Sequence, residues 1–158
     1  MVDDLVVVLG LETGSLPFEP ETLDVASVAE EAISLVEARS PRHSVATRWE
    51  SGTPLLAHAD VEHLPRILTT LMLNACRRMP EGGEIIVGGR GDGDVVTVSI
   101  SDTGPGAVDA LEPSELRSTG LELYKVRRLV ELHGGTLDER RGSTVSFTLP
   151  RVGERARQ

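Results

Sequence analysis

Cysteine, lysine and aromatic residues are scarce in this 158-residue chain, which contains one cysteine, one tryptophan, one tyrosine and two phenylalanines. The single cysteine, Cys76, excludes an internal disulfide framework and a thiolate metal cage. No apolar run approaches the ~18–20 residues that span a bilayer. The early acids Asp3 and Asp4 predict that no signal peptide is present. These absences predict a cytoplasmic protein.

Positive charge is also in short supply. The chain has 25 acidic against 16 basic residues, a formal net charge of −9. An acidic surface repels phosphate backbones and anionic lipids, so we expect no nucleic-acid partner and no direct membrane contact. The hydrophobic and charged fractions, 39% and 26%, are those of an ordinary globular protein. The length fits one domain, at ~100–200 residues per domain.

Hydrophobic spacing divides the chain into helices and strands. Asp24 is a suitable N-cap for the first helix, and the glycine-rich segment 89–93 predicts a turn between two strands. The predicted helices cover residues 24–38, 60–79 and 120–133, and the predicted strands cover 44–50, 54–58, 84–88, 95–101, 136–139 and 143–149. Helices and hairpins mix without a regular βαβ alternation, which predicts an α+β fold: a two-layer sandwich with about three helices on one face of a mixed, mainly antiparallel sheet.

One candidate site lies where a strand ends at Asp102, followed by Gly104 and Gly106. A carboxylate fixed at a strand end can accept a hydrogen bond from an exocyclic amine, and glycines let the backbone approach a ligand closely. Asp, Gly and Pro are also the usual residues of a plain strand-to-loop turn. This segment alone leaves both interpretations open.

Two helical segments offer further candidates. Asn74 flanks the buried stripe of the second helix, where its amide oxygen suits a hard cation, and Arg77, one turn on, can meet a phosphate. Gly120 stands at the predicted start of the third helix, where free N–H groups suit an anion. The alternatives are a boundary asparagine with solvated arginines, and ordinary capping by Ser118 or Thr119.

Histidines supply weaker signals. His58, Asp60 and His63 are spaced like metal ligands, but a strand end followed by a helix cap explains them more simply. We interpret His133, before a pair of glycines, as a helix C-terminal residue that interacts with the helix dipole. Cys76 is expected in the core.

Together the three candidate segments, in this order and spacing, resemble the Bergerat-fold ATP-binding domain of sensor histidine kinases, type II topoisomerases and heat-shock chaperone ATPases. The histidine-kinase branch is the most similar. Residues 67–83 resemble the N box of that family, 102–106 the first glycine box, 119–123 the second glycine box and 142–150 the closing strand. The resemblance extends over about residues 21–150.

The resemblance implies ATP and Mg²⁺ as ligands, with Asp102 on the adenine amino group and Asn74 on the metal. The ATP-binding residues that it implies are Asn74, Arg77, Arg78, Asp102, Gly104, Gly106, Thr119, Gly120, Leu121, Ser143 and Thr144. No catalytic residue is expected within this chain, since the phosphoacceptor histidine belongs to a separate segment.

Several positions depart from the family pattern. Thr70 stands where the hydrolysing relatives have a general-base glutamate, and a threonine cannot take a proton from water. Arg78 stands where kinases commonly have an aromatic residue. Glu122 replaces the second glycine of the usual Gly-x-Gly and brings a negative charge toward the phosphates. The segment between Gly106 and Thr119 is short, which predicts a reduced ATP lid.

The predicted organisation is a remnant of a dimerisation helix at residues 1–14, a catalytic domain at 15–150 and a disordered tail at 151–158. Expected partners are the phosphoacceptor and dimerisation helices of the parent kinase and a response regulator, with the isolated domain monomeric. The main alternative is a degenerate Bergerat domain that acts as a binding module or pseudokinase. A further alternative is a serine kinase of the anti-sigma-factor type.

Overall fold

A five-stranded mixed sheet forms one layer of the molecule, in the strand order β2-β4-β5-β7-β6. A computed structural model describes residues 9–10, 12–50, 54–103, 113–139 and 144–152. The strands of the sheet are β2 His43–Trp49, β4 Gly83–Asp92, β5 Val95–Asp102, β6 Leu137–Glu139 and β7 Thr144–Pro150. β2 pairs with β4 in parallel, whereas β4–β5, β5–β7 and β7–β6 are antiparallel.

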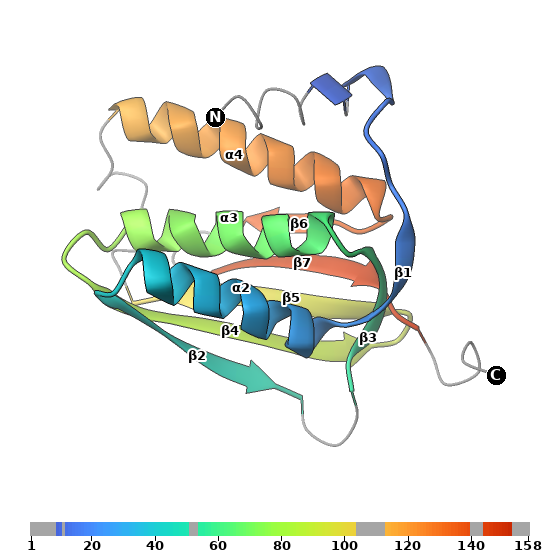
Figure 1. The fold of residues 1–158 in the computed structure, drawn as a ribbon, viewed down its shortest axis with the longest axis horizontal. Helices are drawn as coiled ribbons and strands as arrows, with labels where there is room; N and C mark the ends of the chain where they lie inside the picture. Colours follow the sequence, from blue (N-terminus) through green and yellow to red (C-terminus); the bar gives the residue numbers. More distant parts are fainter. Residues whose placement is uncertain (1–8, 11, 51–53, 104–112, 140–143, 153–158) are drawn as a thin grey trace.

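Three helices form the second layer and cover one face of the sheet (Figure 1). They are α2 Val25–Arg39, α3 His63–Arg77 and α4 Pro113–Leu132. In Figure 1, α2 and α3 run in one direction and α4 runs back above α3. A separate antiparallel pair, β1 Pro20–Asp24 with β3 Leu56–Asp60, closes the end of the molecule where α2 and α3 begin. The predicted α+β two-layer architecture is confirmed.

The core lies between the two layers and follows the hydrophobic periodicity of each element. Every second residue of β5 is buried, and these residues face the helices, because successive side chains of a strand point to opposite faces. The buried residues of this interface include Val96, Val98, Ile100, Phe147 and Leu149 from the sheet and Leu64, Ile67, Leu68, Met72, Val126 and Leu129 from the helices. Cys76 is buried at the edge of this core, as predicted, and burial raises the pKa of its thiol.

Local signals placed most element ends correctly. Asp24 caps α2, with its Oδ1 atom accepting a hydrogen bond from the backbone N–H of Ala26 at 3.1 Å. The turn predicted at residues 89–93 is wrong, because β4 continues to Asp92. A Cβ atom at Gly89 would come within 2.8 Å of the Trp49 ring, so this glycine makes room for a neighbour across the strand. The chain reverses only at Gly93, whose φ of 63° favours glycine.

The predicted start of the third helix is also wrong. α4 begins at Pro113, not at Gly120, and the glycine lies well inside the helix. Residues 113–119 show no strong hydrophobic period, so the pattern gave no sign of a helix there. None of the helices in the described part of the chain is long and apolar enough to cross a membrane.

Candidate functional site

Asp102 lies at the end of β5 beside the end of α3. Its side chain is only 5% exposed, and its Oδ2 atom lies 3.5 Å from Nε of Arg78, the C-cap residue of α3. The hydrogen-bonded ladder holds the strand end in place, with Asp102 opposite Ile85 of β4. The predicted site residues Asp102 and Arg78 therefore form an ion pair that connects the end of β5 to the end of α3.

Asn74, Arg77 and Glu122 form a second polar cluster next to this pair. The Nη2 atom of Arg77 donates to Oδ1 of Asn74 and to Oε2 of Glu122, the latter at 2.8 Å. Asn74 is 8% exposed, and its Nδ2 atom is buried without a hydrogen-bond partner among the described residues. A buried polar atom without a partner costs free energy, typically ~1–3 kcal/mol, so such a group calls for an explanation.

Glu122 is therefore not a bare carboxylate, because it forms an ion pair with Arg77. Sequence reasoning identified the carboxylate as a departure from the family pattern but missed its ion pair with Arg77. The two residues are separated by 45 positions and come from different helices. No local signal in either segment could have indicated the pairing.

Gly120 occupies an interior position of α4, where glycine costs ~1 kcal/mol relative to alanine. A Cβ atom at this position would meet nothing within 4 Å apart from the helix's own backbone, among the described residues. Packing against those residues does not explain the glycine. The neighbouring Leu121 is an exposed large hydrophobic residue, which is also unusual for packing.

The remaining predicted residues are only partly described. Thr144, the first residue of β7, has its Oγ1 atom 3.0 Å from Oγ of Ser101, next to Asp102. Gly104, Gly106 and Ser143 lie outside the described residues, as does the side chain of Thr119.

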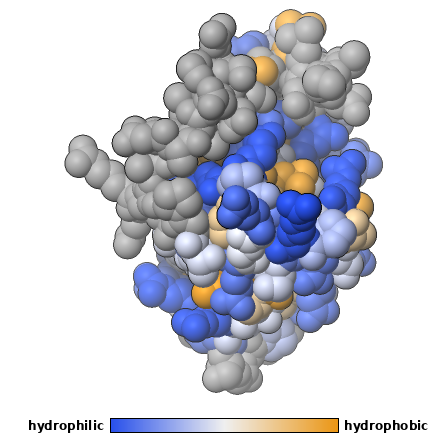
Figure 2. All heavy atoms as spheres, turned by 90° about the vertical axis from the view of Figure 1, so that its left-hand side faces the viewer, coloured by the Kyte–Doolittle hydropathy of each residue, from blue (hydrophilic) through white to orange (hydrophobic). Residues whose placement is uncertain are grey.

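Figure 2 shows the end of the molecule at which α3 ends and α4 begins. Strongly hydrophilic residues gather there around a small hydrophobic area.

A family model described as "Histidine kinase-, DNA gyrase B-, and HSP90-like ATPase" matches residues 59–153, which include the whole of this cluster. The chain belongs to this ATPase family. The sensor histidine kinase ZraS of Escherichia coli (strain K12) is 29% identical over 143 residues, covering 82% of this chain and 31% of ZraS. This ATPase domain thus spans less than a third of the length of that relative.

Two solved structures share the fold. The full-length protein ShkA in complex with AMPPNP is 24% identical, covers 96% of this chain and 35% of that chain, and has a TM-score of 0.76. The histidine kinase ThkA in complex with the response regulator protein TrrA is 22% identical, covers 94% of this chain and 47% of that chain, and has a TM-score of 0.67. In both structures the matched part is less than half of a longer chain.

The residues present fit a magnesium ion of the kind that ATPases of this family use. Asn74 supplies a buried amide oxygen, which is a ligand type that Mg²⁺ accepts. Within the described residues, no three His, Cys, Asp or Glu side chains come together in a way that could hold a metal ion. A cation at Asn74 would therefore take most of its ligands from water and from nucleotide phosphates, as Mg²⁺ usually does.

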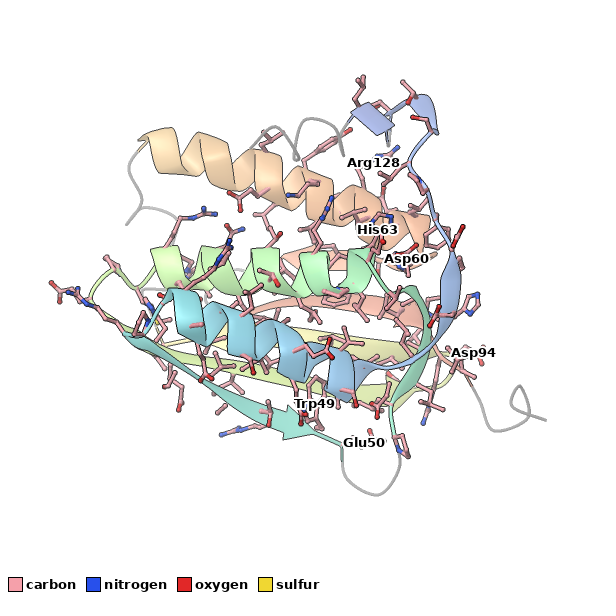
Figure 3. All side chains as sticks on the ribbon, viewed as in Figure 1. Trp49, Glu50, Asp60, His63, Asp94 and Arg128 are labelled. Atoms are coloured by element: carbon pink, nitrogen blue, oxygen red, sulfur yellow. The ribbon has the colours of Figure 1, made fainter. Side chains whose placement is uncertain are left out.

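The opposite end of α3 holds a different polar cluster in this ATPase domain. Figure 3 shows Asp60 and His63 together at the start of α3, beneath α4. The Oδ1 atom of Asp60 accepts from the backbone N–H groups of Glu62 and His63, and Oδ2 accepts from that of Glu19 at 2.7 Å. Burial acts to raise the pKa of Asp60, but these three hydrogen bonds lower it below its ordinary value. As predicted, Asp60 binds N–H groups at the start of the helix, but it does so from the end of β3: the helix begins at His63 and not at Asp60, and its N-cap residue is Glu62.

His133 follows α4 and connects its end to this cluster. Its Nδ1 atom donates to the carbonyl of Leu129 at 2.7 Å, and its Nε2 atom accepts from the backbone N–H of Asp60 at 3.0 Å. Because Nε2 accepts a hydrogen bond it carries no proton, and burial lowers the pKa of His133. The predicted interaction with the helix end is confirmed as a hydrogen bond to a last-turn carbonyl, but the ring carries no positive charge.

Proposed function

We propose that this ATPase domain is the ATP-binding catalytic domain of a sensor histidine kinase, which presents Mg-ATP for phosphotransfer to a histidine on a separate segment in two-component signalling. One observation carries the proposal. Asn74 and Asp102, which are both predicted to contact the nucleotide, lie at the same end of the helical layer. Asn74 is 8% exposed and the side chain of Asp102 is 5% exposed, and each is paired with an arginine. The similarity to ZraS supports the kinase assignment.

Each residue has a role that its chemistry supports. Asp102, whose side chain is buried, is an acceptor for the amino group of adenine, and Arg77, whose side chain reaches solvent and is 37% exposed, is a cation for a phosphate. Asn74 offers an oxygen to Mg²⁺, which neutralises charge on the phosphates when it is bound. The chain itself binds and orients the nucleotide, and such positioning supplies most of the rate in phosphoryl transfer.

Rapid hydrolysis of ATP by this domain is not expected. Thr70 lies four residues before Asn74, on the buried side of α3, and is 8% exposed. A threonine hydroxyl at that position cannot act as a general base toward water. The nucleotide is therefore kept for transfer to a partner segment.

The proposal includes a set of partners and a location. The phosphoacceptor helices of the parent kinase receive the phosphoryl group, and a response regulator follows, a pairing supported by the ThkA–TrrA complex. The complex of ShkA with AMPPNP, an ATP analogue, supports the nucleotide class. The isolated domain is a cytoplasmic monomer that contacts neither nucleic acid nor membrane.

One observation favours a second function, that of a degenerate domain which binds nucleotide weakly. Arg77 and Arg78 engage the two oxygens that the nucleotide needs, on Asn74 and Asp102, and Glu122 adds a negative charge. A nucleotide must break these contacts before it can bind. Such a module would act through protein contacts in place of phosphotransfer.

Calorimetric titration with ATP, with and without Mg²⁺, tests the proposal. We expect Asp102→Asn to weaken ATP binding by about 10- to 100-fold, because it replaces one acceptor oxygen by a donor and removes a charge-assisted hydrogen bond worth ~1.5–3 kcal/mol. Asp92→Asn removes the same charge at the exposed end of β4 and is the matched control, which should bind like the native protein. Unchanged affinity in a folded Asp102→Asn variant would reject the nucleotide site.

A further inference from the structure

A single guanidinium group joins oxygens from two different helices in this domain. The Nη2 atom of Arg77 donates to the amide oxygen of Asn74 on α3 and to the carboxylate of Glu122 on α4. Since both oxygens bond to one nitrogen, they lie within two hydrogen-bond lengths of each other, at most roughly 6 Å apart. The space between the two helices is thus lined by two converging oxygens and holds a positive charge.

The same two oxygens are suited to a divalent cation. Carboxylate and amide oxygens are the protein ligands that Mg²⁺ takes, and it commonly uses one or two of them together with phosphates and water. A guanidinium and a divalent cation repel each other strongly at this separation, so they cannot share the oxygen pair. Arg77 therefore occupies the position that a cation would take.

The three side chains differ in how far they are exposed to solvent. Arg77 is 37% exposed, whereas the side chain of Glu122 is 18% exposed and Asn74 is 8% exposed. The side chain of Arg77 borders solvent, whereas the two oxygens lie between the helices. The buried Nδ2 atom of Asn74, which has no partner among the described residues, is a donor that suits an acceptor such as a phosphate oxygen.

We propose that Glu122 is a second oxygen of this chain for the divalent cation that accompanies the nucleotide, bound directly or through the water shell of the cation. Arg77 holds the oxygen pair when the nucleotide is absent and moves to the phosphates when it binds. The inference rests on the proposed function and assigns a binding role to a residue that, as a bare carboxylate beside phosphate, would only repel ATP.

The two roles of Glu122 differ in how ATP binding depends on metal. A carboxylate that only repels phosphates weakens the binding of metal-free ATP and, to a smaller degree, that of Mg-ATP, because Mg²⁺ neutralises part of the phosphate charge. A carboxylate that holds the cation weakens the binding of metal-free ATP but strengthens that of Mg-ATP. The direction in which Mg-ATP affinity changes when the charge is removed therefore separates these roles: it falls if Glu122 holds the cation and rises if Glu122 only repels phosphates. We call the ratio of the dissociation constants without and with Mg²⁺ the magnesium gain.

The experiment measures the magnesium gain by calorimetry for the native chain and for Glu122→Gln, which removes the charge and keeps the shape. We expect Glu122→Gln to bind Mg-ATP roughly tenfold more weakly, the lower end of the effect of removing a residue that supports a metal site, and its magnesium gain to fall accordingly. Metal-free ATP should bind more tightly to this variant. Glu122→Asp, which keeps the carboxylate, should restore part of the magnesium gain.

Glu131→Gln is the matched control, since Glu131 lies on the same helix and pairs with Arg128 at the surface. It should leave the magnesium gain unchanged, and melting temperatures would show that all variants are folded. Mg-ATP binding to Glu122→Gln that is as tight as, or tighter than, binding to the native chain would overturn the inference while leaving the proposed function intact. A native chain that binds no ATP under either condition would instead reject the proposed function and the inference with it.

Discussion

The two ends of α3 carry polar clusters of opposite character. At its start, both carboxylate oxygens of Asp60 and both ring nitrogens of His133 are hydrogen-bonded inside the protein, and only Nδ1 of His63 lacks a partner among the described residues. At the end of α3, the Nδ2 atom of Asn74 has no hydrogen-bond partner among the described residues. The oxygens of Asn74 and Asp102 there are held by the charged side chains of Arg77 and Arg78.

This difference distinguishes a cluster that stabilises the fold from one that is prepared for a ligand. A buried network whose polar atoms are hydrogen-bonded holds its helices and strands in one arrangement. Each broken bond would leave a buried polar atom without a partner, which costs free energy. A cluster with unsatisfied groups is less stable and gains most from a polar ligand. The same helix therefore provides an anchor at its start and a candidate binding site at its end.

The largest effect is expected from breaking the anchor. Asp60→Asn turns one acceptor oxygen into a donor that faces a backbone N–H group, and it removes the charge that the three hydrogen bonds stabilise. We expect a loss of ~2–4 kcal/mol in the free energy of unfolding, measured with urea. ATP affinity of the folded fraction should not change, since the binding cluster lies at the other end of α3.

Asp24→Asn is the control for this loss. Asp24 caps α2 with one backbone hydrogen bond, and asparagine caps helices as well as aspartate, so we expect a change well below that of Asp60→Asn. Equal losses in the two variants would show that Asp60 acts only as a helix cap and that the link to Glu19 contributes nothing.

A second prediction concerns pH. The pKa of His133 in the folded protein lies below the ordinary value of 6.5. The unfolded chain therefore binds a proton more readily, and stability is lost as pH falls below about 6.5, until the folded-state pKa is passed. Protonated Nε2 would direct its new N–H group at the N–H of Asp60. Asp60 itself loses its contribution only in more acidic solution, below its ordinary value of 3.8.

Urea unfolding at pH 7.5 and 5.5 checks this prediction. The groups that face His133 include Asp60, His63 and His58, and His58 is exposed at the surface. We expect His133→Asn to flatten the pH dependence in this range, whatever its effect on stability at pH 7.5, and His58→Gln to retain it. A native-like slope in His133→Asn would assign the titration to another group.

The smallest effect is expected at Gly120, which lies in α4 near the candidate binding site. Gly120→Ala should stabilise α4 by about 0.5–1 kcal/mol, because alanine is the better helix former and the described surroundings leave space for its methyl group. If the backbone at this position approaches the nucleotide, the same variant should bind ATP more weakly. A more stable protein with unchanged ATP affinity would show that Gly120 does not contact the nucleotide.

Sequence reasoning predicted the fold more completely than the candidate site. The stripe of Leu64, Ile67, Leu68 and Met72 is amphipathic within one helix, so its burial follows from local spacing alone. The glycine-rich run in β4 was wrongly predicted as a turn, because glycine marks a close approach as well as a reversal. The start of α4 was misplaced because residues 113–119 carry no hydrophobic period.

The sequence by itself determined the features that depend on near neighbours: the helix stripes, the alternation of β5, the caps at Asp24 and Asp60, and the ordered motifs of the ATPase family. Only the tertiary structure decided which distant residues meet. The parallel pairing of β2 with β4, the bond between Asp60 and His133, and the bridge from Asn74 through Arg77 to Glu122 each join residues that lie far apart in the chain. Such contacts depend on the packing of whole elements, which no short stretch of sequence encodes.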